Sequence, residues 1–259
     1  MKHLLAVIIV LSAVLPGRLA SAENIREKLT TDISALKGDY ANFYLDTGSM
    51  LRLGAGLAGG AFLANTSADR EFQEYYRDDL RSSTTDGFSK VFRVPGEPLA
   101  AVPVLAALRL AFPLDSPIGL WSQRTLRGIF LGGPAAYLIQ NIAGGGRPEE
   151  GADTSRWRGP FHNNNSLSGH TFIGALPLIT AARMQDDPYL KAMLYAASPL
   201  TGLSRINDDK HYVSQVFLGW YLAYMSAVAV EGTGAGKDYS AGVIPLAGNG
   251  FLVFFDRRF

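Results

Sequence analysis

The sequence predicts an all-α protein, a bundle of helices with a small β-hairpin near the C-terminus. Apolar runs of helical length recur along the chain, and most are shorter than the roughly 20 residues that a membrane-spanning helix needs. They are rich in Gly and Ala and are often interrupted by proline, which favours buried helices of one domain. The runs cover residues 53–64, 99–112, 129–142, 171–182, 190–203 and 213–230.

The first 22 residues are predicted to be a secretion signal. Lys2 gives a positive start, residues 4–15 are apolar, and Ala20-Ser21-Ala22 forms a small-x-small cleavage site. We expect cleavage after Ala22 and an exported protein, either periplasmic or membrane-associated. The alternative is an uncut membrane anchor, for which the apolar run is short.

Two amphipathic helices are expected in the N-terminal third. Residues 23–45 carry apolar side chains three and four positions apart, and glycines in the run 53–64 would allow close helix packing. Residues 69–81 are strongly charged, so we expect a surface helix with a solvated charged face and one apolar stripe. The stripe consists of Phe72, Tyr75, Tyr76 and Leu80. Gly and Pro in residues 86–98 predict a loop or hinge.

Turn signals divide the second half of the chain. The glycine triplet at 144–146 is predicted to end the helix of residues 129–142, and it lacks the Gly-Lys-Ser/Thr part of a Walker loop. We expect one helical domain over residues 23–230. Residues 231–259 are expected to form a flexible link and a hairpin around Gly-Asn-Gly at 248–250.

Composition argues against several classes of function. The formal net charge is +1 and there is no basic tail or stripe, so nucleic acid is not an expected partner. The chain contains no cysteine, which excludes disulfides, thiolate metal sites and a thiol nucleophile. Its four histidines lack the spacing of a zinc pair, and no acidic cluster suggests a metal cage. We therefore expect chemistry with no metal and no other cofactor.

Three short motifs carry residues suited to phosphate chemistry: Gly146-Arg147-Pro148, Ser168-Gly169-His170, and Ser204-Arg205 followed by His211. Arginine binds phosphate oxygens bidentately and stays charged at any working pH. The second motif opens the apolar run 171–182, and the start of a helix offers free N–H groups to an anion. One histidine can attack phosphorus while another supplies a proton to the leaving group.

In order and internal spacing these motifs resemble those of the type 2 phosphatidic acid phosphatases, whose fold and site are shared with vanadium haloperoxidases. That family has Lys-x6-Arg-Pro, Pro-Ser-Gly-His and Ser-Arg-x5-His-x3-Asp. Here the motifs are Gln140-x6-Arg147-Pro148, Leu167-Ser168-Gly169-His170 and Ser204-Arg205-x5-His211-x3-Gln215. The resemblance implies a helical bundle of this family's type.

The resemblance also implies a role for each site residue. His211 would attack phosphorus and form a phosphohistidine. His170 would protonate the leaving oxygen and then help water to hydrolyse the intermediate. The remaining members would bind the phosphate oxygens: Arg147, Arg205, Ser168, the Gly169 N–H, and Gln140 in the place of the family's lysine.

Three positions differ from the family pattern. Leu167 replaces a proline and is expected to affect only the turn into the helix. Gln140 replaces a lysine and removes one positive charge from the phosphate site. Gln215 replaces the aspartate that orients the nucleophilic histidine; its carbonyl can still accept a hydrogen bond but brings no charge. Asp208 and Asp209 are the alternative source of that charge.

The sequence thus predicts an exported, metal-independent phosphatase for phosphate monoesters, with lipid phosphates as candidate substrates. Gln140 and Gln215 favour an alternative, a non-catalytic phosphate- or phospholipid-binding protein. A vanadate-dependent haloperoxidase is a third and less favoured function. The apolar runs fit a soluble or peripherally attached domain or a polytopic membrane enzyme, and their short length favours the first.

Overall fold

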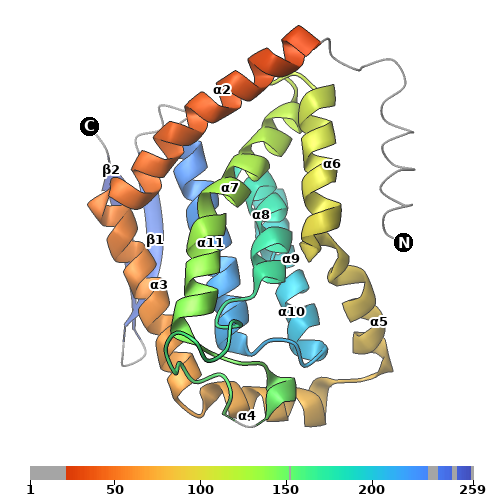
Figure 1. Cartoon of the computed structure of the whole chain (residues 1–259), viewed down its shortest axis with the longest axis vertical. Helices are drawn as coiled ribbons and strands as arrows, with labels where there is room; N and C mark the ends of the chain where they lie inside the picture. The colour runs from red at the N-terminus through yellow and green to blue at the C-terminus, as the bar shows by residue number, and fades with distance from the viewer. Residues whose placement is uncertain (1–21, 152, 233–238, 247–249, 258–259) are drawn as a thin grey trace.

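The computed structural model describes residues 22–151, 153–232, 239–246 and 250–257, so residues 1–21 of the predicted signal lie outside the described residues (Figure 1). The described chain is helical apart from one hairpin, which confirms the predicted all-α class. Its elements are α2 (Ala22–Tyr40), η1 (Ala41–Leu45), α3 (Thr47–Asn65), α4 (Ala68–Tyr75), η2 (Tyr76–Leu80), α5 (Ser83–Phe92), η3 (Val94–Gly96), α6 (Pro98–Ala111), α7 (Pro117–Ala143), η4 (Pro148–Glu150), α8 (Gly169–Arg183), α9 (Pro188–Ala197), α10 (Leu200–Asn207), α11 (Val213–Gly232), β1 (Tyr239–Leu246) and β2 (Gly250–Arg257).

Helices α7, α8 and α11 lie at the centre of the bundle, with α3 on one side and α5 and α6 on the other, and α2 runs across the top of the view (Figure 1). Their facing surfaces bury apolar side chains, among them Leu131, Leu176 and Leu222. Helix α3 approaches α11 closely, as its glycines predict, because a Cβ atom on Gly60 would lie 2.6 Å from the Leu218 side chain. These three core helices carry Gln140, His170 and Gln215, whereas Ser204 and Arg205 lie in α10.

Helix α4, at the start of the charged stretch 69–81, does not pack through the predicted apolar stripe. Asp69 and Gln73 are buried, whereas Tyr75 of the expected stripe is 52% exposed. The Asp69 carboxylate accepts hydrogen bonds from the Ser214 backbone N–H (2.8 Å) and hydroxyl (2.6 Å) at the start of α11. Helix α4 therefore meets a helix end with free N–H groups rather than an apolar surface, which is why its polar face turns inward.

Residues 86–92, predicted to be part of a loop or hinge, are instead in helix α5. The helix begins at a capping box, in which Ser82 and Thr85 exchange side-chain and backbone hydrogen bonds. Its Ser89 side chain is buried, and the Ser89 hydroxyl oxygen lies 3.1 Å from the Ser204 carbonyl oxygen in α10. Capping and this tertiary contact outweigh the glycine in the helix, which faces open space.

Two further helix boundaries differ from the predictions. The apolar run 190–203 is divided between α9 and α10, because Pro199 has no N–H to continue the first helix. The run 129–142 is part of the longer α7, which ends as predicted at the glycine triplet: Gly144 has a left-handed backbone (φ 77°). This ending turns the chain toward the second motif.

At the C-terminus, β1 and β2 pair antiparallel, with Leu246 opposite Gly250. Two residues of the expected Gly-Asn-Gly turn, 248 and 249, and most of the expected link, residues 233–238, lie outside the described residues. Within the described chain, α11 is long and apolar enough to cross a membrane, and α5–η3 with α6 would qualify as a pair bent by 52°. Since 67% of the α11 window is buried inside the protein, α11 is equally a core helix.

Candidate active site

The three motifs meet at one end of the bundle, beside α4 (Figure 1). The Ser168 N–H donates to the Gln215 carbonyl oxygen (2.9 Å), which joins the second motif to the third. The Gln215 side-chain amide donates to the Gly146 carbonyl oxygen (2.6 Å), which joins the third motif to the first. Segments far apart in the sequence are thus held together by buried hydrogen bonds.

His211 is 5% exposed, and its Nδ1 lies 2.8 Å from Oε1 of Gln215. The orientation of the Gln215 amide follows from its other bonds, because Nε2 donates to Gly146 and Oε1 accepts from the Tyr212 N–H (3.2 Å). Oε1 can only accept, so Nδ1 of His211 carries the proton and Nε2 keeps its lone pair. Gln215 thus orients the ring as expected, although His211 itself precedes the helix.

The electrostatic surroundings keep His211 uncharged. Burial lowers the pKa of His211 to about 3, and the charges of Arg205 and Arg147 act in the same direction, whereas the bond to Gln215 opposes them. The imidazole is therefore neutral at pH 7. A neutral ring with a free lone pair on Nε2 is the form that can act as a nucleophile.

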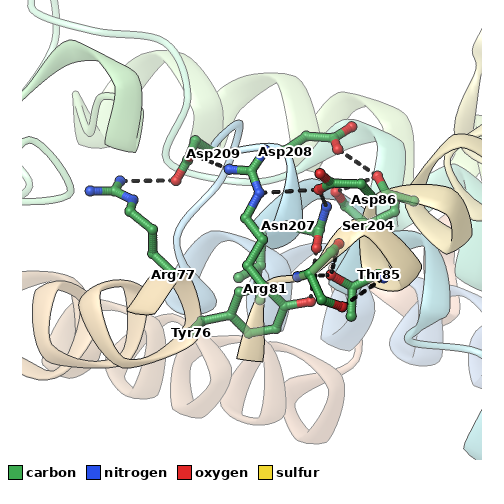
Figure 2. Close-up of polar contacts among 12 residues, drawn as sticks. Tyr76, Arg77, Arg81, Thr85, Asp86, Ser204, Asn207, Asp208 and Asp209 are labelled. Atoms are coloured by element: carbon green, nitrogen blue, oxygen red, sulfur yellow. Dashed lines mark hydrogen bonds and ion pairs between the residues drawn. The ribbon is translucent and has the colours of Figure 1, made fainter. Parts of the chain in front are cut away.

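Asp208 and Asp209, the alternative charge partners expected for His211, make their hydrogen bonds with other residues. Asp209 accepts hydrogen bonds from Gln73 (2.7 Å), Arg77 (2.9 Å) and Arg81 (2.9 Å), and Figure 2 shows its carboxylate beside both arginines. Asp208 accepts from the Ser89 hydroxyl (2.6 Å) and lies 3.8 Å from Arg205. These contacts hold the chain between Arg205 and His211; they do not supply a carboxylate to the imidazole.

The two arginines differ in how they are held. The Arg205 side chain is 11% exposed, and among the described residues its buried Nε has no hydrogen-bond acceptor. Arg147 is more exposed; its Nε donates to Asn165 (2.9 Å) and its Nη1 lies 3.3 Å from Glu149. A buried guanidinium N–H without an acceptor is costly, so an anionic oxygen bound there would remove the cost.

His170 has a partner that the sequence did not indicate. Its Nε2 lies 3.3 Å from a carboxylate oxygen of Glu97, the residue just before α6. Burial and then Arg205 lower the pKa of His170, whereas Glu97 raises it. Glu97 was missed because it lies within residues 86–98, which were expected to be a loop or hinge, and because no spacing links it to the motifs.

Ser168, Gly169 and Gln140 surround the start of α8. The Ser168 hydroxyl is fully buried and caps the helix, accepting from the Thr171 N–H (3.3 Å) and hydroxyl (2.8 Å). Gly169 is half-buried at the first helical position. The Gln140 amide donates to the Leu167 carbonyl oxygen (2.9 Å), so it fastens the turn that precedes the helix.

The site combines two histidines and two arginines at the start of a helix, within an all-α bundle. Among the described residues there is no group of three or more His, Asp or Glu side chains placed to hold a metal ion. Side chains of these types are suited to binding phosphate oxygens and to proton transfer.

A model of the PAP2 superfamily matches residues 129–232, the segment that carries all three motifs. The match confirms the resemblance to the type 2 phosphatidic acid phosphatases. Searches of curated proteins and of solved structures found no match. Members of the superfamily generally catalyse phosphoester hydrolysis, which indicates an activity of the phosphatase type.

Proposed function

We propose that the protein is an exported, metal-independent phosphatase that hydrolyses phosphate monoesters through a phosphohistidine, with lipid phosphates among its candidate substrates. The observation that carries the proposal is the pairing of His211 with Gln215, which leaves a neutral Nε2 lone pair close enough to Arg205 for that charge to lower its pKa. The unpartnered Nε of Arg205 supports it, since a phosphoryl oxygen would satisfy this group.

In the first step, Nε2 of His211 attacks phosphorus and the bond from phosphorus to the ester oxygen breaks. Arg147 and Arg205 neutralise the phosphoryl oxygens, and the free N–H groups at the start of α8 add donors there. His170, when protonated, gives its proton to the departing oxygen, so the alcohol leaves uncharged. The product is a phosphohistidine, and the electron pair of Nε2 has become the N–P bond.

In the second step, water attacks the phosphohistidine. The now neutral His170 takes a proton from that water, the N–P bond breaks and its electron pair returns to Nε2 of His211. Inorganic phosphate leaves and both histidines regain their starting states. Gln215 holds the ring in one tautomer throughout but carries no negative charge, so the positive charge that develops on the imidazole is offset by the phosphoryl group itself.

A binding protein without turnover is the second candidate. It is favoured by the neutral Gln215 beside His211 and by the Gln140 amide, which already donates to Leu167 and adds no charge to the site. Such a protein would keep both arginines and bind phosphate or a phospholipid headgroup without hydrolysing it.

The test is a phosphatase assay on a panel of soluble and lipid phosphate monoesters, with His211→Ala beside the exposed control His162→Ala. Parent and control should release phosphate, remain active in EDTA and be inhibited by vanadate, whereas His211→Ala should be inactive but bind phosphate. Activity that needs a divalent ion, or that survives in His211→Ala, contradicts the mechanism. Phosphate binding without hydrolysis in the parent favours the binding protein.

A further inference from the structure

The segment from α5 to Glu97, the residue before α6, lies against α8 and α10, although the sequence analysis assigned it no part in the site. The Thr201 hydroxyl of α10 donates to the Phe92 carbonyl oxygen (2.9 Å). Gly96 is buried, and a Cβ atom there would lie 2.5 Å from the His170 carbonyl oxygen and 2.7 Å from Thr201. Only glycine allows this approach, so the chain is built to place the next residue, Glu97, beside the start of α8.

Glu97 occupies the N-cap position of α6 but does not cap it, since its side chain makes no cap hydrogen bond. Pro98 at the first helical position has no N–H that needs an acceptor. The Glu97 carboxylate instead lies 3.3 Å from Nε2 of His170. The side chain thus has no function in the helix start and is directed at an imidazole of the site.

We propose that Glu97 is a positioning residue for His170: its carboxylate accepts the Nε2–H, fixes the ring, and leaves Nδ1 to carry the proton to and from the reacting oxygen. This inference rests on the proposed phosphatase function. The protonated ring then donates on both sides, to the carboxylate and to the leaving group. A carboxylate that orients a catalytic imidazole is a recurring device in proton transfer.

The charges around His170 show why a carboxylate is needed there. Arg205 from α10 and Arg147 from the loop before η4 both act on the ring, and His170 in turn acts on His211. Burial and the two arginines disfavour the imidazolium, whereas Glu97 is the neighbour whose charge favours it. Asp208 cannot replace Glu97, because its carboxylate accepts from Ser89 and faces Arg205.

The experiment is an NMR titration of the histidines in the purified protein, with Glu97→Gln, Glu97→Asp and the control Glu74→Gln, at an exposed position of α4. The titration midpoint of His170 should fall in Glu97→Gln, recover in part in Glu97→Asp, and stay unchanged in Glu74→Gln. The midpoint of the exposed His162 should not move in any variant. An unchanged His170 midpoint in Glu97→Gln overturns the proposal. If Glu97→Gln does not fold, an unchanged His170 midpoint in Glu97→Asp overturns it instead.

Kinetics separate this proposal from the proposed function. The alkaline limb of kcat/KM against pH should move down with the His170 midpoint, with a loss on the order of tenfold on that limb for Glu97→Gln and little loss at lower pH. If the parent has no phosphatase activity, the function fails while the titration still decides the pairing. If the parent is active but the alkaline limb of kcat/KM does not move with the His170 midpoint, the phosphatase function is retained and the proposed role of Glu97 in catalysis is wrong.

Discussion

Replacing Gln215 by glutamate, which has the same shape, tests the hydrogen bonds that hold the site together. The amide oxygen accepts from His211 Nδ1 and the Tyr212 N–H, and the amide nitrogen donates to the Gly146 carbonyl oxygen at 2.6 Å. In Gln215→Glu the second carboxylate oxygen would face that carbonyl oxygen with no hydrogen between them. In Gln215→Asp the shorter side chain would withdraw from Gly146 altogether.

Both variants therefore leave a buried acceptor without its donor, and this should cost about 1–3 kcal/mol in the free energy of unfolding. Both also place a carboxylate beside His211, so the pKa of this ring should rise from about 3. In the parent that pKa lies below its unfolded value, so the stability from the neutral ring is present above about pH 6.5 and is lost as the pH falls toward 3. This loss at acid pH should be smaller in the variants.

The assay combines urea unfolding at pH 7 with NMR titration of His211 and the acid limb of kcat/KM. Gln185→Glu, two residues past the C-terminal end of α8, is the matched control for the change of amide to carboxylate. Both Gln215 variants should unfold at a lower urea concentration than the parent, and the acid limb of their kcat/KM should lie at higher pH. Gln185→Glu should show neither change. The reasoning is refuted if Gln215→Glu unfolds like the parent and His211 titrates unchanged, because the amide would then not make these bonds.

Three further predictions concern the phosphate site, the chain that supports it and the pH dependence. Gln140→Lys adds one positive charge near the start of α8, so the inhibition constants of phosphate and vanadate should fall; unchanged constants would show that position 140 does not reach the anion. Asp209→Ala removes an acceptor shared by a buried glutamine and two partly exposed arginines, so urea unfolding should show a loss of about 1–2 kcal/mol, unlike Asp115→Ala at an exposed site. The parent's kcat/KM should have an acid optimum, because His211 loses its proton near pH 3 and burial lowers the pKa of the acid His170 below 6.5; an optimum above pH 7 contradicts these roles.

Much of the fold could be predicted because its core helices are continuous apolar runs. The boundaries of helices α8 and α11 lie within a few residues of those of the runs 171–182 and 213–230. Both helices are buried on nearly all sides, so each leaves an unbroken apolar run in the sequence. The face of α4 could not be predicted from its apolar spacing. Its Asp69 is buried against the polar start of α11, a partner that only the tertiary structure supplies.

The motif residues of the site could be predicted because their spacing is local. Gln215 follows His211 by four positions, within the reach of one side chain, and the bond between them is present. Glu97 could not be predicted, because its proximity to His170 depends on how Gly96 packs against α8. The hydrogen bonds of Asp209 with Arg77 of η2 and with Arg81, the C-cap of η2, could not be predicted either, because they too depend on the tertiary structure.

The most direct measurement is the trapping of a phosphoenzyme. Parent protein, His211→Ala and His162→Ala are mixed with a phosphate monoester labelled in its phosphoryl group, quenched within the first turnover in base, and mapped by peptide mass. The proposed mechanism predicts label on His211 in the parent and in His162→Ala, and none in His211→Ala. Rapid hydrolysis by the parent with no labelled enzyme, or equal labelling of His211→Ala, would show that His211 is not the nucleophile.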